Sequence, residues 1–257
     1  LMMHGSKTED LFAPKRKWYQ RFARWLIRHV DAIGLLSHDE VADWKRFEPD
    51  GVYCKLNNPF LPDERAKGFE RKFETGEPLR LLFIGRLIPS KGVMDLIDAL
   101  PLILERVDCK LTIAGFGPLQ GEIELRRQEP SLKGRIEFAG YLTGEALSSL
   151  YLQADIFVLP TYFGEGFPTV VTEALSFGLP VVTTQIRGCK DHLTDHKDVL
   201  FVKPLDPAEI AGKVIQLAED PDLRQQLSLN GLVTIKEFEP DRVSKQYYEC
   251  FERVQHG

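Results

Sequence analysis

The stretch DIFVLPTYFGEGFPTVVTEALSFGLPVVTT, residues 155–184, decides the fold of this chain. Its first six residues and its last five, 180–184, form short apolar runs rich in β-branched side chains, as strands buried inside a parallel sheet do. Between these runs, Pro168 suits the first turn of a helix and Gly178 suits the residue that ends one. The stretch therefore predicts a strand, a helix over 168–177 and a second strand, which is a unit of an α/β fold.

The same alternation of apolar runs and helical segments extends from residue 79 to about residue 235. The further strand candidates are residues 79–85, 109–115, 134–140 and 199–204. Each is nearly continuous in hydrophobicity, as expected when helices cover both faces of a parallel sheet. The sequence therefore predicts an α/β fold with a Rossmann-like doubly wound parallel sheet, in which ligands bind outside the carboxyl ends of the strands.

The chain divides into four predicted parts. Residues 1–60 read as α/β but offer only two or three strands, too few for an independent core, so we expect the incomplete tail of an N-terminal domain. The charged segment 61–78 is expected to be a linker. Residues 79–236 would form the Rossmann-like domain, and residues 237–257 a C-terminal helix.

Charge and composition exclude several classes of protein. A net charge of −5 argues against a general nucleic-acid binder, which needs a basic surface. No apolar run is long enough to span a membrane and no signal peptide is visible, so we expect neither. The cysteines, Cys54, Cys109, Cys189 and Cys250, are scattered without metal-ligand spacing, which predicts reduced thiols in a cytoplasmic protein and no zinc site.

Two cations follow the first strong strand candidate, in FIGRLIPSKG at 83–92. Gly85 and Gly92 permit tight backbone turns there. Arg86 and Lys91 would lie at the carboxyl end of the strand, where an arginine fork and a lysine point charge suit a diphosphate. The alternative is that both are ordinary solvated surface charges.

A glycine-rich turn follows the next strand, in IAGFGPLQGE at 113–122. Gly115 and Gly117 form only a lone GxG, which is weak evidence for a dinucleotide site. The alternative is that these glycines simply close a strand-to-helix loop.

Two glutamates flank the start of the helix predicted over 168–177. The open backbone amides of Thr169, Val170 and Val171 would form an anion site there, helped by the helix dipole. Glu165 in the preceding loop and Glu173 in the helix would repel a phosphate, unless each accepts hydrogen bonds from neutral hydroxyls on either side of it. This layout fits a sugar–diphosphate–nucleoside; the alternative is a loop charge and an exposed helix residue.

These motifs, in this order and spacing over residues 79–235, resemble the nucleotide-binding C-terminal domain of a family 4 retaining glycosyltransferase of the GT-B fold. Glu165 and Glu173 match the E-x7-E element of that family in full. Family members generally need no divalent metal, so the resemblance implies no metal and no cofactor, with a nucleotide-diphosphate sugar as the donor substrate.

The resemblance also implies residue roles. Arg86 and Lys91 would act as catalytic residues that hold the diphosphate and stabilise the leaving group. Glu165 would act as a further catalytic residue that binds donor-sugar hydroxyls near the reacting carbon, and Glu173 would bind the ribose hydroxyls. The other implied donor-binding residues, which contact the sugar and phosphates or flank the base, are Gly85, Gly115, Gly117, Tyr141, Leu142, Gly166, Phe167, Thr169 and Val170.

Residues 1–60 resemble the end of the family's N-terminal domain. LMMHG at 1–5 resembles a strand end where such enzymes place a histidine near the donor sugar, so His4 is a catalytic candidate. A surface or core histidine is the alternative. Residues 237–254 resemble the terminal helix that crosses back to the N-terminal domain. Because family members are much longer, we expect an upstream part to be absent and do not expect this chain by itself to transfer sugar.

Residues 15–29, KRKWYQRFARWLIRH, contain six lysines and arginines and no acid. Trp18, Phe22 and Trp25 would lie on one helical stripe. Such basic aromatic helices favour anionic membrane surfaces, which would suit a lipid-linked acceptor. The alternative is that the aromatic stripe packs into the N-terminal core.

The leading functional hypothesis is a retaining hexosyltransferase that moves a sugar from a nucleotide donor to a glycan or lipid-linked glycan. We expect it to act in bacterial-type surface polysaccharide or glycolipid synthesis, in the cytoplasm and peripherally at the membrane. The alternatives are a GT-B-like sugar-nucleotide epimerase, a phosphorylase and a nucleotide-sugar-binding module. The donor base, the donor sugar and the acceptor do not follow from the sequence.

Overall fold

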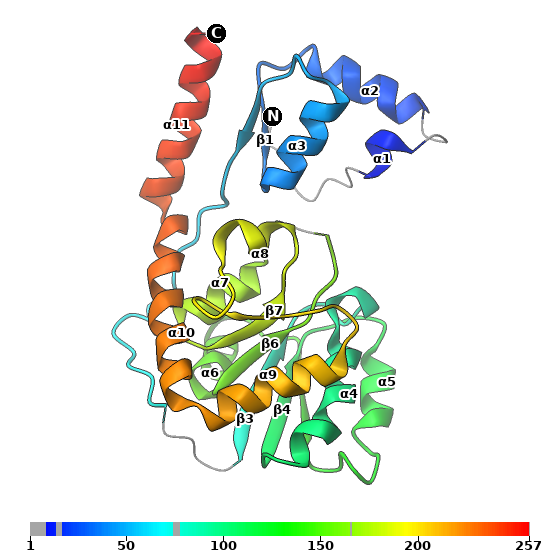
Figure 1. The fold of residues 1–257 in the computed structure, drawn as a ribbon, viewed down its shortest axis with the longest axis vertical. Coiled ribbons are helices and arrows are strands. Elements are labelled where there is room, and N and C mark those ends of the chain that lie inside the picture. Colours follow the sequence, from blue (N-terminus) through cyan, green and yellow to red (C-terminus); the bar gives the residue numbers. More distant parts are fainter. Residues whose placement is uncertain (1–8, 14–16, 74–77, 165, 257) are drawn as a thin grey trace.

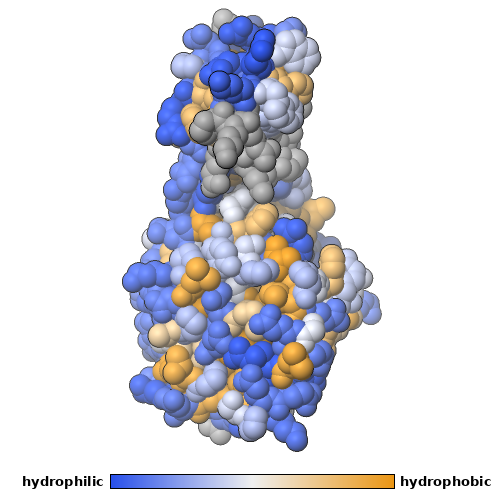
Figure 2. All heavy atoms as spheres, turned by 90° about the vertical axis from the view of Figure 1, so that its right-hand side faces the viewer, coloured by the Kyte–Doolittle hydropathy of each residue, from blue (hydrophilic) through white to orange (hydrophobic). Residues whose placement is uncertain are grey.

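The computed structural model describes residues 9–13, 17–73, 78–164 and 166–256. A larger α/β unit, residues 78–238, carries a smaller unit, residues 9–55, above the ends of its strands (Figure 1). The helix α11, Pro240–His256, leaves the larger unit and runs alongside the smaller one. Figure 2 shows hydrophobic residues scattered among hydrophilic ones on the side of the larger unit that faces the viewer.

The larger unit contains a six-stranded, all-parallel sheet in the order β5-β4-β3-β6-β7-β8. Its strands are β3 Leu79–Ile84, β4 Cys109–Ala114, β5 Ile136–Gly140, β6 Ile156–Leu159, β7 Val181–Thr184 and β8 Leu200–Val202. Every residue of β6 and β7 is buried. The predicted doubly wound parallel sheet is confirmed.

The strand order reverses between β3 and β6, where the chain returns from the edge strand β5 to the middle of the sheet. Right-handed crossovers then place the helices that follow β3 and β4 on one face and those that follow β6 and β7 on the other. On the first face α4, Val93–Leu104, packs against α9, Pro207–Glu219; on the second α7, Thr169–Ser176, packs against α10, Pro221–Thr234. Ligands of doubly wound sheets bind at such a reversal.

The remaining elements of the larger unit are short. They are α5 Gln120–Arg126, α6 Gly144–Gln153, α8 Arg187–His192 and the 3₁₀ helices η1 Pro89–Lys91 and η2 Ile235–Phe238. Local capping explains where α9 begins, because the Asp206 carboxylate accepts a hydrogen bond from the Glu209 amide at 2.9 Å.

The smaller unit contains α1 Glu9–Phe12, α2 Lys17–Ile27, β1 Ile33–Leu35, α3 His38–Phe47 and β2 Tyr53–Lys55. Its strands β1 and β2 form a two-stranded parallel sheet. The buried indole of Trp44 is the largest side chain of the small core between these elements. The Ser37 side chain caps α3 by accepting a hydrogen bond from the Glu40 amide at 3.2 Å.

The segment between the units lies on the larger unit. The Arg71 guanidinium donates hydrogen bonds to the carbonyls of Tyr151 at 2.8 Å and Phe177 at 3.2 Å, and also to the carbonyl of Ala154. A cation at the carboxyl ends of α6 and α7 is favoured by the dipoles of both helices. The described part of the expected linker 61–78 is thus held to the sheet domain by a half-buried arginine.

Cys54 in β2 and Cys250 in α11 form a disulfide, with their Cα atoms 6.1 Å apart. The prediction that all four cysteines are reduced thiols is therefore wrong for this pair, whereas Cys109 and Cys189 are buried thiols outside any disulfide. The pair is separated by 196 residues in sequence, so only the return of α11 to β2 brings it together. Since disulfides are rare in the cytosol, the cysteines no longer support a cytoplasmic location.

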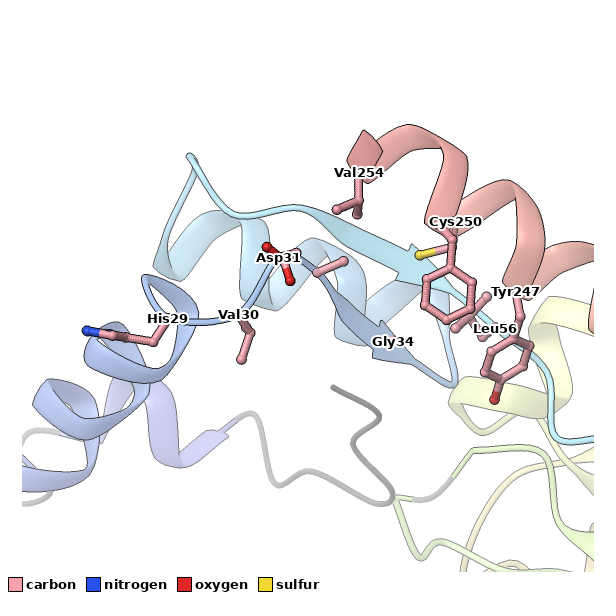
Figure 3. Close-up of a pocket in the computed structure, with 10 residues that line it drawn as sticks. His29, Val30, Asp31, Gly34, Leu56, Tyr247, Cys250 and Val254 are labelled. Atoms are coloured by element: carbon pink, nitrogen blue, oxygen red, sulfur yellow. The ribbon is translucent and has the colours of Figure 1, made fainter. Parts of the chain in front are cut away.

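Figure 3 shows Cys250 on α11 with its sulfur directed at β2. The same helix and the smaller unit enclose a cavity of about 430 Å³, lined by residues that include Leu56 and Tyr247. The lining is mainly apolar, and Leu56 packs with the Cys54–Cys250 pair and with the half-buried Tyr247 of α11.

Candidate functional site

The loops after β3 and β4 touch backbone to backbone at the carboxyl edge of the sheet. Gly115 has a φ of +145°, and a Cβ atom on it would lie 1.9 Å from the carbonyl oxygen of Gly85. A Cβ atom on Gly117, with a φ of +156°, would lie 2.4 Å from the carbonyl oxygen of Leu87. Both positions therefore require glycine. The expectation that these glycines close a loop is confirmed, and their predicted donor contacts stay a prediction.

The loop after β6 is joined to the loop after β3. The Ser90 carbonyl accepts hydrogen bonds from the Tyr162 amide at 2.9 Å and from the Thr161 hydroxyl at 3.0 Å. A Cβ atom on Gly92 would lie 2.3 Å from the carbonyl oxygen of Pro160, so the two loops leave no space between their backbones here. These contacts fix the β6 loop beside the two cations.

Arg86 and Lys91 converge on one aromatic ring. The guanidinium carbon of Arg86 lies 5.1 Å from the centre of the Phe163 ring, and the ammonium nitrogen of Lys91 lies 5.3 Å from it. Each distance is within cation–π range. Arg86 is exposed but Lys91 is buried, with 6% of its surface accessible, so the alternative of two solvated surface cations is wrong for Lys91. Both cations therefore lie beside the Phe163 ring, and their positive charge favours an anion nearby.

The helix α7 begins a few residues after Phe163. Its N-cap is Pro168, whose side chain has no acceptor, so the amides of Thr169 and Val170 lie at an uncapped helix end. The Val171 amide instead donates to the Pro168 carbonyl at 3.0 Å, which corrects the expectation that it is open. Helix dipole and amides together attract an anion to this end of α7.

The residues just before α7 lie between the two units. A Cβ atom on Gly166 would lie 2.8 Å from Cβ of Leu36 in the smaller unit. A Cβ atom on Gly188, at the start of α8, would lie 2.3 Å from backbone atoms of both Gly166 and Phe167. The described part of this loop is therefore held between the smaller unit and α8.

Glu173 points toward α6 and not into open solvent. Its carboxylate accepts a hydrogen bond of 2.6 Å from the Tyr151 hydroxyl. Burial raises the pKa of Glu173, and the hydrogen bond from Tyr151 partly offsets this. The carboxylate lines a cavity of about 230 Å³ whose other lining residues include Gly144 and Asp63. The alternative of an exposed helix residue is wrong, and the ribose-binding role of Glu173 stays a prediction.

Two exposed aromatic rings stand at the ends of β4 and β5. Phe116 is 56% exposed and Tyr141 is 67% exposed, and their rings meet edge to face with centres 5.4 Å apart. Leu142, also predicted to flank the base, is half-buried beside them. Phe116 was missed by the sequence analysis, although a large aromatic residue between two loop glycines was the available signal.

Two of the predicted catalytic residues, Glu165 and His4, lie outside the described residues. Within the described ranges, no group of three or more His, Cys, Asp or Glu side chains is placed to hold a metal ion. The described predicted residues Gly85, Arg86, Lys91, Gly115, Gly117, Tyr141, Leu142, Gly166, Phe167, Thr169, Val170 and Glu173 all belong to the carboxyl edge of the sheet or to α7.

The helix α2 presents its aromatic side chains to solvent. Trp18, Phe22 and Trp25 are 68%, 50% and 54% exposed, while Ala23 and Ile27 face the core. These three side chains therefore do not pack into the described core of the smaller unit, and the alternative of packing in a complete N-terminal domain stays a prediction. In the part of the chain that the structure describes, no helix combines the length and the apolar character needed to cross a bilayer.

Comparison with known proteins identifies the family of the chain. Residues 64–232, more than half of the chain, match the family model of glycosyl transferases group 1. An uncharacterized glycosyltransferase of Methanocaldococcus jannaschii is 32% identical over 65% of this chain and 43% of its own length. The phosphatidyl-myo-inositol mannosyltransferase of Mycobacterium tuberculosis is 29% identical over 80% of this chain and 53% of its own length.

The fold also matches solved structures, among them one described as a glycosyltransferase from Rickettsia africae, with a TM-score of 0.74 and 14% identity over 93% of this chain and 67% of that protein. The crystal structure of Anabaena Alr3699/HepE in complex with UDP superposes with a TM-score of 0.78 and 18% identity, over 98% of this chain and 71% of that protein. The chain spans about half the length of the curated relatives it matches. From the family match, the chain belongs to the glycosyl transferases of group 1.

Proposed function

We propose that this chain binds a nucleotide-diphosphate sugar at the reversal between β3 and β6, as the donor-binding part of a retaining, family 4-type glycosyltransferase. The observation that carries the proposal is the convergence of Arg86 and Lys91 on Phe163, in the loop that leads to the uncapped start of α7. Two cations and an uncapped helix end at the same edge of the sheet suit a diphosphate.

The same groups would assist departure of the nucleotide. When the bond between the anomeric carbon and the phosphate oxygen breaks, the leaving diphosphate gains negative charge. Arg86, Lys91 and the amides of Thr169 and Val170 would stabilise that charge, and we propose no metal for this role. Glu165 would hold hydroxyls of the transferred sugar, and His4 would lie near it in the complete protein.

The nucleoside would extend from this point toward α6 and the exposed ring pair. Glu173 is a half-buried hydrogen-bond acceptor that can hold the ribose hydroxyls. Phe116 and Tyr141 offer exposed aromatic surface to the base. The proposed path thus runs from the sugar near residue 165 through the cations and Glu173 to the two rings.

We further propose a glycan or lipid-linked glycan acceptor and a place in surface polysaccharide or glycolipid synthesis. One relative is named for phosphatidyl-myo-inositol, a lipid, which supports a lipid-linked acceptor. The exposed aromatic and basic face of α2 supports peripheral contact with the cytoplasmic side of a membrane. Transfer itself is proposed for the complete protein, since the chain spans half of its curated relatives.

Calorimetric titration with UDP, GDP and ADP tests the donor site. Thermal unfolding with and without each nucleotide measures the stabilisation that binding should produce. A ligand at 100 times its dissociation constant should add about 2.7 kcal/mol to the free energy of unfolding. We expect one of the three to bind, equally well with EDTA or magnesium. Binding of none would overturn the proposal. Conversion of the sugar in the matching nucleotide sugar, without an acceptor, would favour the epimerase alternative.

A further inference from the structure

A buried histidine joins the two units through a chain of polar contacts. His192, at the end of α8, has a side chain that is 4% exposed. Its Nε2 atom lies 2.7 Å from the Lys55 ammonium in β2, and its Nδ1 atom lies 3.1 Å from a Glu237 carboxylate oxygen in η2. An ammonium group can only donate, so Nε2 accepts, and Nδ1 carries the proton that it donates to Glu237. The contacts therefore require the neutral ring with its proton on Nδ1.

Other contacts fasten α8 to the smaller unit. The Lys190 ammonium of α8 lies 2.7 Å from the Asp39 carboxylate of α3. The Asp191 carboxylate accepts a hydrogen bond of 2.8 Å from the backbone amide of His38 at the start of α3. The carboxyl end of α8 is therefore attached both to β2 and to α3, and a shift of the smaller unit would act on it directly.

The same short helix supports the loop before α7. The His192 ring lies 5.4 Å from the Phe167 ring and 4.7 Å from the Phe238 ring, and those two phenyl rings stack at 4.8 Å. At the other end of α8, Gly188 touches the backbone of that loop so closely that a Cβ atom would not fit. The position of Phe167 thus depends on α8 at two points.

We propose that His192 is a positioning residue that couples the placement of the smaller unit to the donor site. In its neutral form it ties β2 to α8 and holds Phe167, and so it fixes the loop from which the anion-binding end of α7 begins. The inference rests on the proposed nucleotide site at α7, and it adds a regulation of that site by the proton on His192.

The charges around the His192 ring determine how the coupling responds to pH. The titratable groups that face His192 are Lys55 from β2, Glu237 from η2 and Asp191 from α8 itself. A proton on Nε2 would place two cations 2.7 Å apart and remove the acceptor that Lys55 uses. Burial, followed by the Lys55 charge, lowers the pKa of His192, while Glu237 and Asp191 oppose the shift. The link is therefore intact at neutral pH and is lost as the pH falls below the ordinary histidine range.

Nucleotide-sugar affinity as a function of pH tests the coupling. The probes are UDP-glucose and GDP-mannose, because their diphosphates have no proton to gain between about pH 5 and 8. We expect the affinity of the natural chain to fall about fivefold or more on acidification, with a fraction of a proton released when the nucleotide sugar binds. His192→Phe keeps the ring stack but has no nitrogen, so its profile should be flat. Lys55→Met removes the repelling cation and should move the transition to higher pH.

His196→Phe is the matched control, because His196 is half-exposed on another surface. A fall in affinity that persists unchanged in His192→Phe would overturn the inference while leaving the nucleotide site intact. If no nucleotide sugar binds the natural chain, the proposed function fails instead. The coupling is then read without ligand, from NMR signals of the Phe167 ring, which must shift with the same midpoint as His192. Phe167 signals that do not change as His192 titrates would overturn the inference in that case.

Discussion

The hydroxyl of Tyr151 in α6 donates a 2.6 Å hydrogen bond to the carboxylate of Glu173 in α7. We predict that Tyr151→Phe lowers the free energy of unfolding by about 2 kcal/mol at neutral pH, because a half-buried carboxylate loses its donor. The phenyl ring retains the stacking on Phe177, whose ring centre lies 5.2 Å away. Urea unfolding measures the loss, and Tyr248→Phe, which removes an exposed hydroxyl, is the control.

The same substitution has a pH dependence of defined sign. Burial raises the pKa of Glu173 above its unfolded value, and the Tyr151 hydrogen bond lowers it. Without that bond the folded pKa rises further, so folding takes up a proton at higher pH and the protein gains stability as the pH falls. The deficit of Tyr151→Phe should therefore shrink between pH 7 and about pH 5. A deficit that grows on acidification would show that the carboxylate does not titrate in this way.

Substitutions of Arg86 and Glu173 should affect the binding of different parts of a nucleotide, the diphosphate and the nucleoside. We predict that Arg86→Ala weakens UDP or GDP binding about tenfold and leaves the free nucleoside unaffected, because one charge-assisted contact to phosphate is lost. Glu173→Ala should weaken nucleoside and nucleotide alike. Calorimetry with uridine, guanosine and their diphosphates measures both effects. Arg106→Ala, which removes the exposed partner of Glu219, is the control, and equal losses for both ligands in both variants would contradict the assignment.

The sheet could be predicted because each strand is buried on both faces. The run at 155–160 became β6, Ile156–Leu159, and the run at 180–184 became β7, Val181–Thr184. A strand that is buried on both faces has no position for polar residues. Each such strand can therefore be recognised in the sequence by its own continuous apolar run. The six-residue helix α8 was not predicted, because RGCKDH has no apolar period and is held by contacts to the smaller unit.

The site could be predicted only in part, for a related reason. Arg86 and Lys91 follow directly from their place after a strand, since carboxyl ends of parallel strands meet at one edge. Phe163, which brings the two cations together, belongs to a different loop, and its contact depends on β6 lying next to β3. Tyr151 and the Cys54 disulfide are likewise long-range pairings, which no local spacing reveals.

The closely packed loops at the sheet edge should not tolerate a methyl group. We predict that Gly115→Ala lowers the free energy of unfolding by about 3 kcal/mol, because φ is unfavourable and the new Cβ atom would overlap the Gly85 carbonyl. Gly212→Ala in α9 has open space around it and should instead stabilise by about 1 kcal/mol. Thermal and urea unfolding of the two variants provide the comparison. A neutral Gly115→Ala would contradict the backbone contact.

The disulfide should account for a large part of the attachment of α11. Cross-linking residues far apart in sequence restricts the unfolded chain, so we predict that reduction, or the double variant Cys54→Ser with Cys250→Ser, costs about 2–5 kcal/mol. The double variant should be insensitive to dithiothreitol, which makes it its own control. Thiol titration in denaturant should detect two thiols without reductant, from Cys109 and Cys189. Four thiols in freshly purified protein would contradict the pairing.

The exposed face of α2 should bind anionic membranes. Arg21 is exposed and belongs to this face, whereas Arg24 already lies 3.4 Å from the Glu48 carboxylate. Because each basic residue near an anionic surface contributes about 1 kcal/mol, Arg21→Glu should weaken binding to phosphatidylserine vesicles by about 2 kcal/mol, or roughly thirtyfold. Lys45→Glu makes the same charge change on α3 and should leave vesicle flotation unchanged if the face is specific. Equal losses in both variants would mean that overall charge, and not the aromatic helix, attracts the protein to the vesicle.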